Sequence, residues 1–226
     1  MARQTSKGQC NLCGGIFSKS PMTKHLKSCK QKQADSKTST PDQVSRKEQV
    51  FHLLVEGRYS PEYWMHIELP ANASLEVLDR FLRDIWLECC GHMSMFSIQD
   101  KRYSVAPMAD FDEESMEAGL DAVLSPGMKF YHEYDFGSTT YLTLKVVSQE
   151  QKQIKGKDIA VLARNEPPSY PCMSCGKTAA HICTECMYEG EGCLCDECVT
   201  EHECEEEMLL PIVNSPRIGV CGYTGD

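Results

Sequence analysis

Hydrophobic and polar residues alternate along the middle of the chain in a pattern that is typical of β-strands. The segments 49–57 (QVFHLLVEG) and 63–70 (YWMHIELP) are rich in aromatic and branched residues, and a turn at Ser60-Pro61 separates them. The same pattern predicts further strands at 94–98, 128–135, 139–148 and 158–163.

A helical pattern interrupts these strands. In SLEVLDRFLRDIWLECC, which starts at Ser74, hydrophobic residues recur every three or four positions: Leu78, Phe81, Leu82, Ile85, Trp86 and Cys89. Ser74 can cap the start of this helix and Gly91 its end. We expect a second, short helix near 115–124. The order of elements predicts an α+β body, with a largely antiparallel sheet packed on one main helix.

The two ends of the chain lack such patterns and differ in charge. Residues 1–50 contain ten Lys/Arg against three Asp/Glu, and the remainder contains thirteen against thirty. The head is therefore basic and the rest acidic, which favours contact with polyanions at one end only. Without a signal-peptide pattern or a long apolar run, we expect a cytoplasmic protein that does not enter a membrane.

Cysteine changes the interpretation of the acidic end. Residues 172–204 hold eight of the fourteen cysteines, and disulfides are rare in the cytosol. Three C-x-x-C pairs and one H-x-C pair would supply two tetrahedral zinc sites: Cys172, Cys175, Cys183, Cys186, Cys195, Cys198, His202 and Cys204.

These pairs can be combined in more than one order. A cross-braced order joins Cys172 and Cys175 to Cys195 and Cys198, and leaves the other two pairs for the second ion. This arrangement resembles B-box and MYND-like zinc modules. Sequential pairing is the alternative, and His181 or Cys193 could replace one of the ligands.

The basic head contains a shorter metal pattern. Cys10, Cys13, His25 and Cys29 give C-x2-C-x11-H-x3-C, which resembles a C-C-H-C zinc finger. His25 and Cys29 would share one helix face because they are four residues apart. Lysines on or near that helix are candidate phosphate contacts, against the alternatives of a solvated face or a protein-binding finger: Lys19, Lys24, Lys27 and Lys30.

The division of the chain follows from these patterns. We expect a zinc finger at 1–31 and a flexible polar linker at 32–47, so that the finger moves independently of the body. The α+β domain would span 48–165, and the cysteine-rich module with its C-terminal tail would span 166–226.

The body also resembles a known family. The segment from Tyr63 to Ile98 and the later MKFYHEYDFGSTTYLTLKVV resemble the plasmid pRiA4b ORF-3-like family, also called the insertion-element passenger TnpR family. The resemblance implies association with plasmids or mobile elements, without an established reaction. Members often have an acidic residue, a Trp and a His soon after the YDFG turn, whereas this chain has Ser138, Thr140 and Leu142 there.

Other side chains have a functional and a structural interpretation. The turn Tyr134–Gly137 and the acids of 110–114 could form an enzyme site, but we expect a strand-ending turn and an exposed loop. Cys89, Cys90 and His92 could form a metal or nucleophile site, but core packing and a loop are expected there. Cys221 is left as a spare thiol.

The sequence thus favours a zinc-binding, non-enzymatic interaction or adaptor protein. We expect three structural Zn²⁺ ions, because four protein ligands leave no open position on an ion. A protein partner is expected, and nucleic acid would be contacted through residues 1–47. The alternatives are an enzyme with a site in the central domain and a thiol-based redox sensor.

Overall fold

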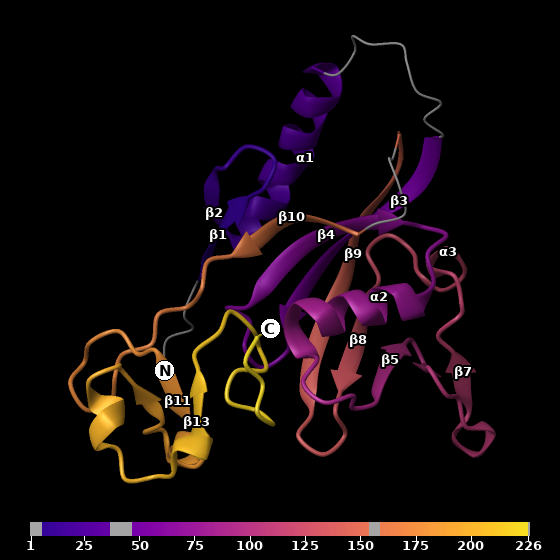
Figure 1. Cartoon of the computed structure of the whole chain (residues 1–226). Helices are drawn as coiled ribbons and strands as arrows, with labels where there is room; N and C mark the ends of the chain where they lie inside the picture. The colour runs from indigo at the N-terminus through magenta and orange to yellow at the C-terminus, as the bar shows by residue number, and fades with distance from the viewer. Residues whose placement is uncertain (1–5, 37–46, 154–158, 226) are drawn as a thin grey trace.

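A computed structural model describes residues 6–36, 47–153 and 159–225, and a ten-stranded sheet runs through most of it (Figure 1). The strands lie in the order β2-β1-β10-β4-β3-β9-β8-β5-β6-β7. Their bounds are β1 Lys7–Cys10, β2 Ile16–Ser18, β3 Lys47–Gly57, β4 Trp64–Pro70, β5 Ser94–Ile98, β6 Lys101–Ser104, β7 Glu113–Ser115, β8 Lys129–Tyr134, β9 Thr140–Gln153 and β10 Ala160–Asn165.

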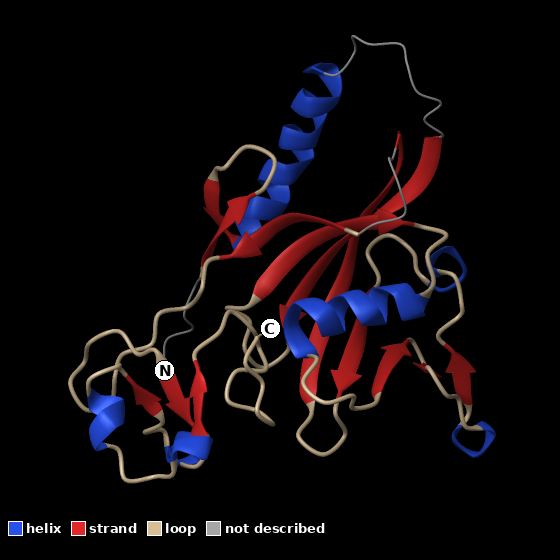
Figure 2. Cartoon of the chain, in the orientation of Figure 1, coloured by secondary structure: helices blue, strands red, loops and turns tan. Residues whose placement is uncertain are grey.

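The predicted α+β class is confirmed. All neighbouring strands of the sheet are antiparallel except the pair β6 and β7. Helix α2 (Leu75–Leu82) lies across one face of this sheet, and α3 (Leu120–Val123) is a single turn (Figure 2). A short 3-10 turn, Ala109–Phe111, precedes β7.

The main helix departs from its predicted extent. Ser74 caps it as expected, since its hydroxyl accepts the backbone N–H of Val77, but the α-helical part ends at Leu82. A π-helical stretch, Arg83–Leu87, follows it. Within this wider turn Trp86 stays fully buried. The chain then reaches Cys89, which lies beside Tyr134 at the end of β8.

The core fills the space between α2 and the sheet. Alternate residues of β3 point into it, and so do the apolar residues of α2 that recur at helical spacing. Each buried apolar side chain contributes roughly 1.5–3 kcal/mol, so this cluster is the main source of stability for the body. Its fully buried members include Phe51, Leu53, Leu78, Leu82, Trp86, Phe96 and Phe130.

The opposite face of the sheet is covered at one end by the N-terminal segment. Helix α1 (Lys19–Ser36) packs Met22 and Leu26 against Trp64 of β4, and all three side chains are fully buried. Strand β1 pairs with β10, where Gly8 lies opposite Asn165. A β-carbon on Gly8 would stand 2.4 Å from the carbonyl oxygen of Arg164, so only glycine permits this approach.

This contact corrects the expectation that the finger moves independently. Its strands β1 and β2 extend the sheet of the body, and its helix shares a buried cluster with β4 and β10. Of the expected linker 32–47, residues 32–36 instead continue helix α1 and Lys47 begins β3, while residues 37–46 lie outside the described residues.

The C-terminal module is a separate small sheet in the order β12-β11-β13. Strand β11 (His181–Cys183) lies between β12 (Cys193–Leu194) and β13 (Leu209–Pro211). Three 3-10 turns complete it: Cys186–Glu189, Cys198–Glu201 and Glu206–Met208. The tail after β13 then returns to the body, where the Ser215 hydroxyl donates to the carbonyl oxygen of Trp86 at 2.6 Å.

Candidate metal centres

The C-terminal module brings its ligands together in the cross-braced order. One group is formed by Cys172, Cys175, Cys195 and Cys198, and the other by Cys183, Cys186, His202 and Cys204. Within each group the ligand atoms lie within 4.8 Å of one another. The sulfurs of Cys175 and Cys195 are 3.6 Å apart, as are those of Cys186 and Cys204.

Tight turns produce this geometry from short spacings. Cys172 and Cys175 flank a turn closed by the bond from Gly176 N–H to the Cys172 carbonyl, at 2.8 Å. Gly176 has a φ of +75°, a conformation that a side chain would strain. The pairing of β11 with β12 then carries the third pair, Cys195 and Cys198, back beside the first.

The local backbone favours the thiolate form at the first cysteine of each group. Burial raises the pKa of the Cys172 thiol, but backbone N–H groups of Cys195 and Cys175 outweigh it and lower the pKa to about 6. At Cys183 burial also raises the pKa, but hydrogen bonds from the N–H of Cys186 and from His202 outweigh it and lower the pKa to about 7. Because thiolates are the metal-binding form, both positions are prepared for an ion.

The two alternative ligands lie outside these groups. His181 turns its Nε2 toward the Asp196 carboxylate at 3.0 Å. Cys193 lies on β12, and burial raises the pKa of its thiol. Neither residue belongs to a metal-binding group of the described residues, so the three C-x-x-C pairs and the H-x-C pair supply both groups.

The finger also brings its expected ligands together. Cys10, Cys13, His25 and Cys29 form one group within 4.8 Å, and Nε2 of His25 lies 3.2 Å from the sulfur of Cys13. The His25 ring stacks on Phe17 with centroids 4.2 Å apart. Cys10 and Cys29 are buried against the sheet, so a bound ion would fix the finger where it docks.

The finger lysines differ in their surroundings. Lys19 forms an ion pair with Glu56 of β3 and also donates to the carbonyl oxygen of Pro61 at 3.1 Å, so it faces the sheet. This removes Lys19 from the group of freely exposed candidates. Lys24 and Lys27 are exposed on α1, and the side chain of Lys30 lies outside the described part.

A fourth group of ligands lies where core packing and a loop are expected from the sequence. Cys89, Cys90 and His92 meet Cys221 of the tail, again with all ligand atoms within 4.8 Å. Burial raises the pKa of the Cys89 thiol, but the Arg217 guanidinium, whose Nη2 is 3.4 Å away, lowers it more. The sequence predicts that Cys89 packs in the core, but its side chain is only half-buried.

Sequence spacing could not reveal this group of ligands, because Cys221 is 131 residues from Cys90.

The YDFG turn beside this group has a structural role that the sequence only partly indicated. Asp135 has a φ of +64°, and its carboxylate accepts the backbone N–H groups of Gly137 and Ser138. Arg217 donates to it at 2.7 Å and, with those N–H groups, lowers its pKa to about 2. Arg217 is fully buried, and no pattern in the sequence indicates this role.

The acids of 110–114 do not join the YDFG turn in a catalytic arrangement. Glu113 accepts the Ser104 hydroxyl at 2.9 Å, and Glu114 pairs with Lys101 at 2.7 Å. Asp110 and Asp112 are exposed. Among the described residues these carboxylates form no metal-binding group. The expected exposed loop is found only in part, because Glu113–Ser115 is strand β7, which pairs with β6.

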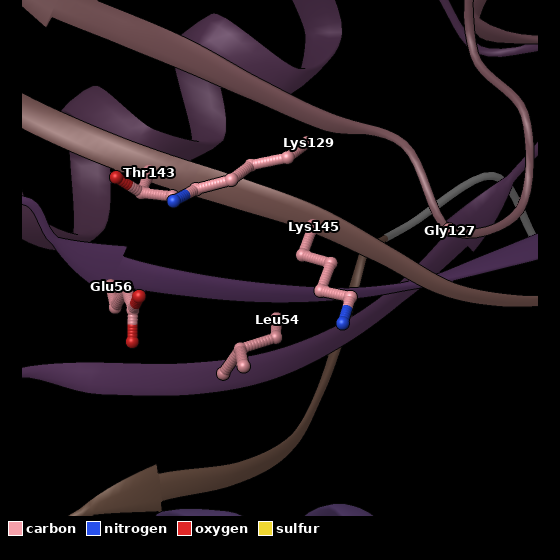
Figure 3. A pocket seen from close by; sticks show the side chains of 6 residues that line it. All are labelled: Leu54, Glu56, Gly127, Lys129, Thr143 and Lys145. Carbon is pink, nitrogen blue, oxygen red and sulfur yellow. The ribbon is translucent and has the colours of Figure 1, made fainter.

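The uncovered part of the sheet presents cations and aromatic rings. A shallow pocket of about 350 Å³ lies beside the finger, and Lys129 of β8 and Lys145 of β9 reach over it (Figure 3). Its other lining residues are Leu54, Glu56, Gly127 and Thr143. Next to it, the Arg58 guanidinium lies 4.7 Å from the ring centre of Tyr131 and 6.0 Å from that of Tyr141.

Comparison with known proteins adds little to this geometry. No protein-family model and no curated protein matches the chain. One similar solved structure is that of MM3350, a protein of unknown function from Methanosarcina mazei Go1. The two are 16% identical, with a TM-score of 0.46 over 52% of this chain and 69% of the other. In addition, no helix of the described residues is long and apolar enough to cross a membrane.

Proposed function

We propose that this chain is a zinc-dependent, non-enzymatic interaction protein that binds single-stranded nucleic acid beside its basic finger. The zinc ions would be structural, since each Cys/His group at the two ends offers four protein ligands and leaves no position for a substrate. The resemblance to the plasmid-associated family is consistent with such a role, and membership in that family is part of the proposal.

The observation that supports nucleic-acid binding most is the open sheet face next to the finger. Residues 129, 131 and 133 of β8 and residues 141, 143 and 145 of β9 point to the same side, opposite α2, and Glu133, beside Tyr141, is the one acid among them. The strand register places Lys129 beside Lys145 and Tyr131 beside Thr143. Lysines can neutralise phosphates while tyrosine and arginine planes stack on unpaired bases.

The charge of the finger completes this surface. Glu56, an acid at the edge of the pocket, is already paired with Lys19 of α1. Lys24 and Lys27 remain exposed on the same helix. The finger thus offsets a negative charge on the sheet and carries further positive charge on its exposed side, which favours a polyanion at this end of the molecule.

The experiment is a binding titration with a fluorescently labelled single strand and with a duplex, at low salt and over a salt series. The variant Lys129→Ala/Lys145→Ala should weaken binding at least tenfold and reduce the salt dependence. Tyr131→Ala should weaken binding to the single strand about tenfold, with a smaller effect on the duplex, because stacking on a base contributes about 1–3 kcal/mol.

Lys101→Ala is the matched control, because Lys101 is exposed on β6 and pairs with Glu114 away from this face. It should bind like the unmodified protein. If the unmodified protein binds neither oligonucleotide at low salt, or if the double variant behaves like the control, the proposal is wrong.

The acidic module would contact a protein partner. Residues 185–207 include ten Asp/Glu and no Lys/Arg, and Glu201 and Glu203 are exposed beside the second ligand group. Such a surface repels nucleic acid and complements a basic protein surface. Affinity capture with the unmodified chain and with Glu201→Lys/Glu203→Lys tests this: a specific partner should be lost from the variant, and equal recovery of all proteins would contradict it.

A further inference from the structure

The fourth ligand group joins two parts of the chain that are far apart in sequence. Cys89, Cys90 and His92 follow the π-helical turn of the body, whereas Cys221 belongs to the tail that returns from the C-terminal module. We propose that this group binds a zinc ion that fastens the C-terminal tail to the central body. The proposal is independent of nucleic-acid binding.

The distances match those of a tetrahedral zinc–thiolate site. Zn–S bonds of about 2.3 Å place two sulfurs of one tetrahedron about 3.8 Å apart. The sulfur of Cys90 lies 3.7 Å from that of Cys89 and 3.9 Å from that of Cys221. These separations are much longer than the S–S bond of a disulfide, which is about 2.05 Å. They are close to the 3.6 Å between the sulfurs of Cys175 and Cys195 and of Cys186 and Cys204.

The histidine points its nitrogen at the same centre. Nε2 of His92 lies 3.0 Å from the sulfur of Cys90 and 3.2 Å from that of Cys221. Its other nitrogen, Nδ1, faces the carboxylate of Asp135 at 3.6 Å. A carboxylate behind a ligating histidine orients the ring and makes it a better ligand, and Asp135 is itself held by Arg217.

The backbone repeats the turn found at the other groups. Gly14 follows Cys13 with a φ of +73°, and Gly176 follows Cys175 with a φ of +75°. In the same way Gly91 follows Cys90 with a φ of +78°, and Gly222 follows Cys221 with a φ of +66°. A β-carbon on Gly91 or Gly222 would meet nothing within 4 Å, so conformation and not space requires glycine there.

Cys221 itself adopts an unusual conformation. Its φ is +51°, which residues with a side chain rarely adopt, and the turn directs its sulfur at His92 and Cys90. Strain of this kind persists where an interaction compensates for it. A metal–thiolate bond would supply that interaction, since among the described residues this sulfur contacts only Cys90 and His92.

The site would differ from the other groups in its exposure. Cys90 and Cys221 are exposed, while Cys89 and His92 are half-buried. An ion here would be within reach of solvent and would exchange more readily than those of the C-terminal module. On binding, the thiols lose their protons, and Arg217 donates to the sulfur of Cys89.

The test is the number of zinc ions per chain, measured by native mass spectrometry in reducing buffer on the chain of residues 1–226. Cys90→Ser and Cys221→Ser should each lose one ion relative to the unmodified protein. Both side chains are exposed, so neither change disturbs the core, and retention of the other ions shows that the variant is folded. Cys193→Ser is the control, because this thiol belongs to no group, and it should lose none.

A second measurement reports on the tail directly. Hydrogen exchange of residues 217–223 should accelerate at least tenfold in Cys221→Ser and in the unmodified protein after mild chelation, with little change in β3 and β9. Equal ion counts in all four proteins would overturn the proposal. The proposal would also be overturned if a variant lost one ion while hydrogen exchange of residues 217–223 stayed the same, because the ion would then not hold the tail to the body.

Discussion

The central body and the C-terminal module achieve a fixed conformation by different means. The body buries large apolar side chains between α2 and the sheet, and Phe51, Phe96 and Trp86 are inaccessible to solvent. The buried cluster of the module consists of Cys172, Leu194 and Cys195, two of which are candidate ligands. So small an apolar cluster offsets little of the conformational entropy of the chain, and metal bonds would supply the stability that the body takes from its core.

The largest expected difference between these regions follows metal removal. A strong chelator should unfold residues 172–211 and leave the central sheet folded, because a structural zinc site contributes about 10–16 kcal/mol to a small domain. Two-dimensional NMR would show this as loss of dispersion for residues of β11, β12 and β13, while the signals of β3 and β9 stay dispersed. Collapse of the signals from β3 and β9 at the same chelator concentration would contradict the separation.

A substitution in the core of the body should destabilise the body and leave the C-terminal module unchanged. Phe130 is fully buried on β8 against Phe96, and Phe130→Ala should lower the free energy of unfolding of the body by about 3–5 kcal/mol. The number of bound ions in the C-terminal module should not change. Urea unfolding combined with elemental analysis measures both quantities, and Lys101→Ala serves as the surface control.

A smaller effect is expected where the tail meets the body. Asp135→Asn would leave the fully buried guanidinium of Arg217 without its charged partner, at a cost of about 3 kcal/mol. Since the pKa of Asp135 is lowered to about 2, its contribution is complete above its ordinary pKa near 4 and is lost only as the pH falls toward 2. An Asp135→Asn variant as stable as the unmodified protein in urea at neutral pH would refute this role.

The mildest perturbation is a change of pH. The thiols of Cys172 and Cys183 have pKa values lowered to about 6 and about 7, so they are thiolates above this range and bind protons as the pH falls through it. Protons then compete with zinc, and the affinity of the module should decrease steeply below about pH 6. Competition with a chromophoric chelator measures this, while the circular dichroism of the body should stay constant.

The same contrast explains how much the sequence could predict. Strands and the main helix follow from local alternation, so β3, β4 and β5 lie close to their expected positions. The candidate ligands at both ends are recognisable because they occur in pairs at short spacings. For the C-terminal module, the sequence leaves open whether these pairs combine in cross-braced or sequential order. Strands β6 and β7 were not expected, because they are short and largely polar.

What the sequence could not indicate depends on contacts between distant segments. Trp64 is buried by the finger helix, which no pattern around Trp64 reveals. Cys221 meets His92 only because the tail returns to the body across the C-terminal module. Arg217 looked like an ordinary charged residue, yet it is the buried partner of the YDFG turn. Long-range pairing of this kind leaves no periodic signal in the chain.

The central claim is that metal–thiolate bonds, in place of an apolar core, hold the C-terminal module in its fold. Hydrogen exchange of β11, measured on the reduced protein with and without stoichiometric chelation of its ions, tests it most directly. We predict protected amides in the metal-loaded protein and complete loss of protection in the metal-free one. Amides of β11 that remain protected after every ion has been removed would contradict the claim.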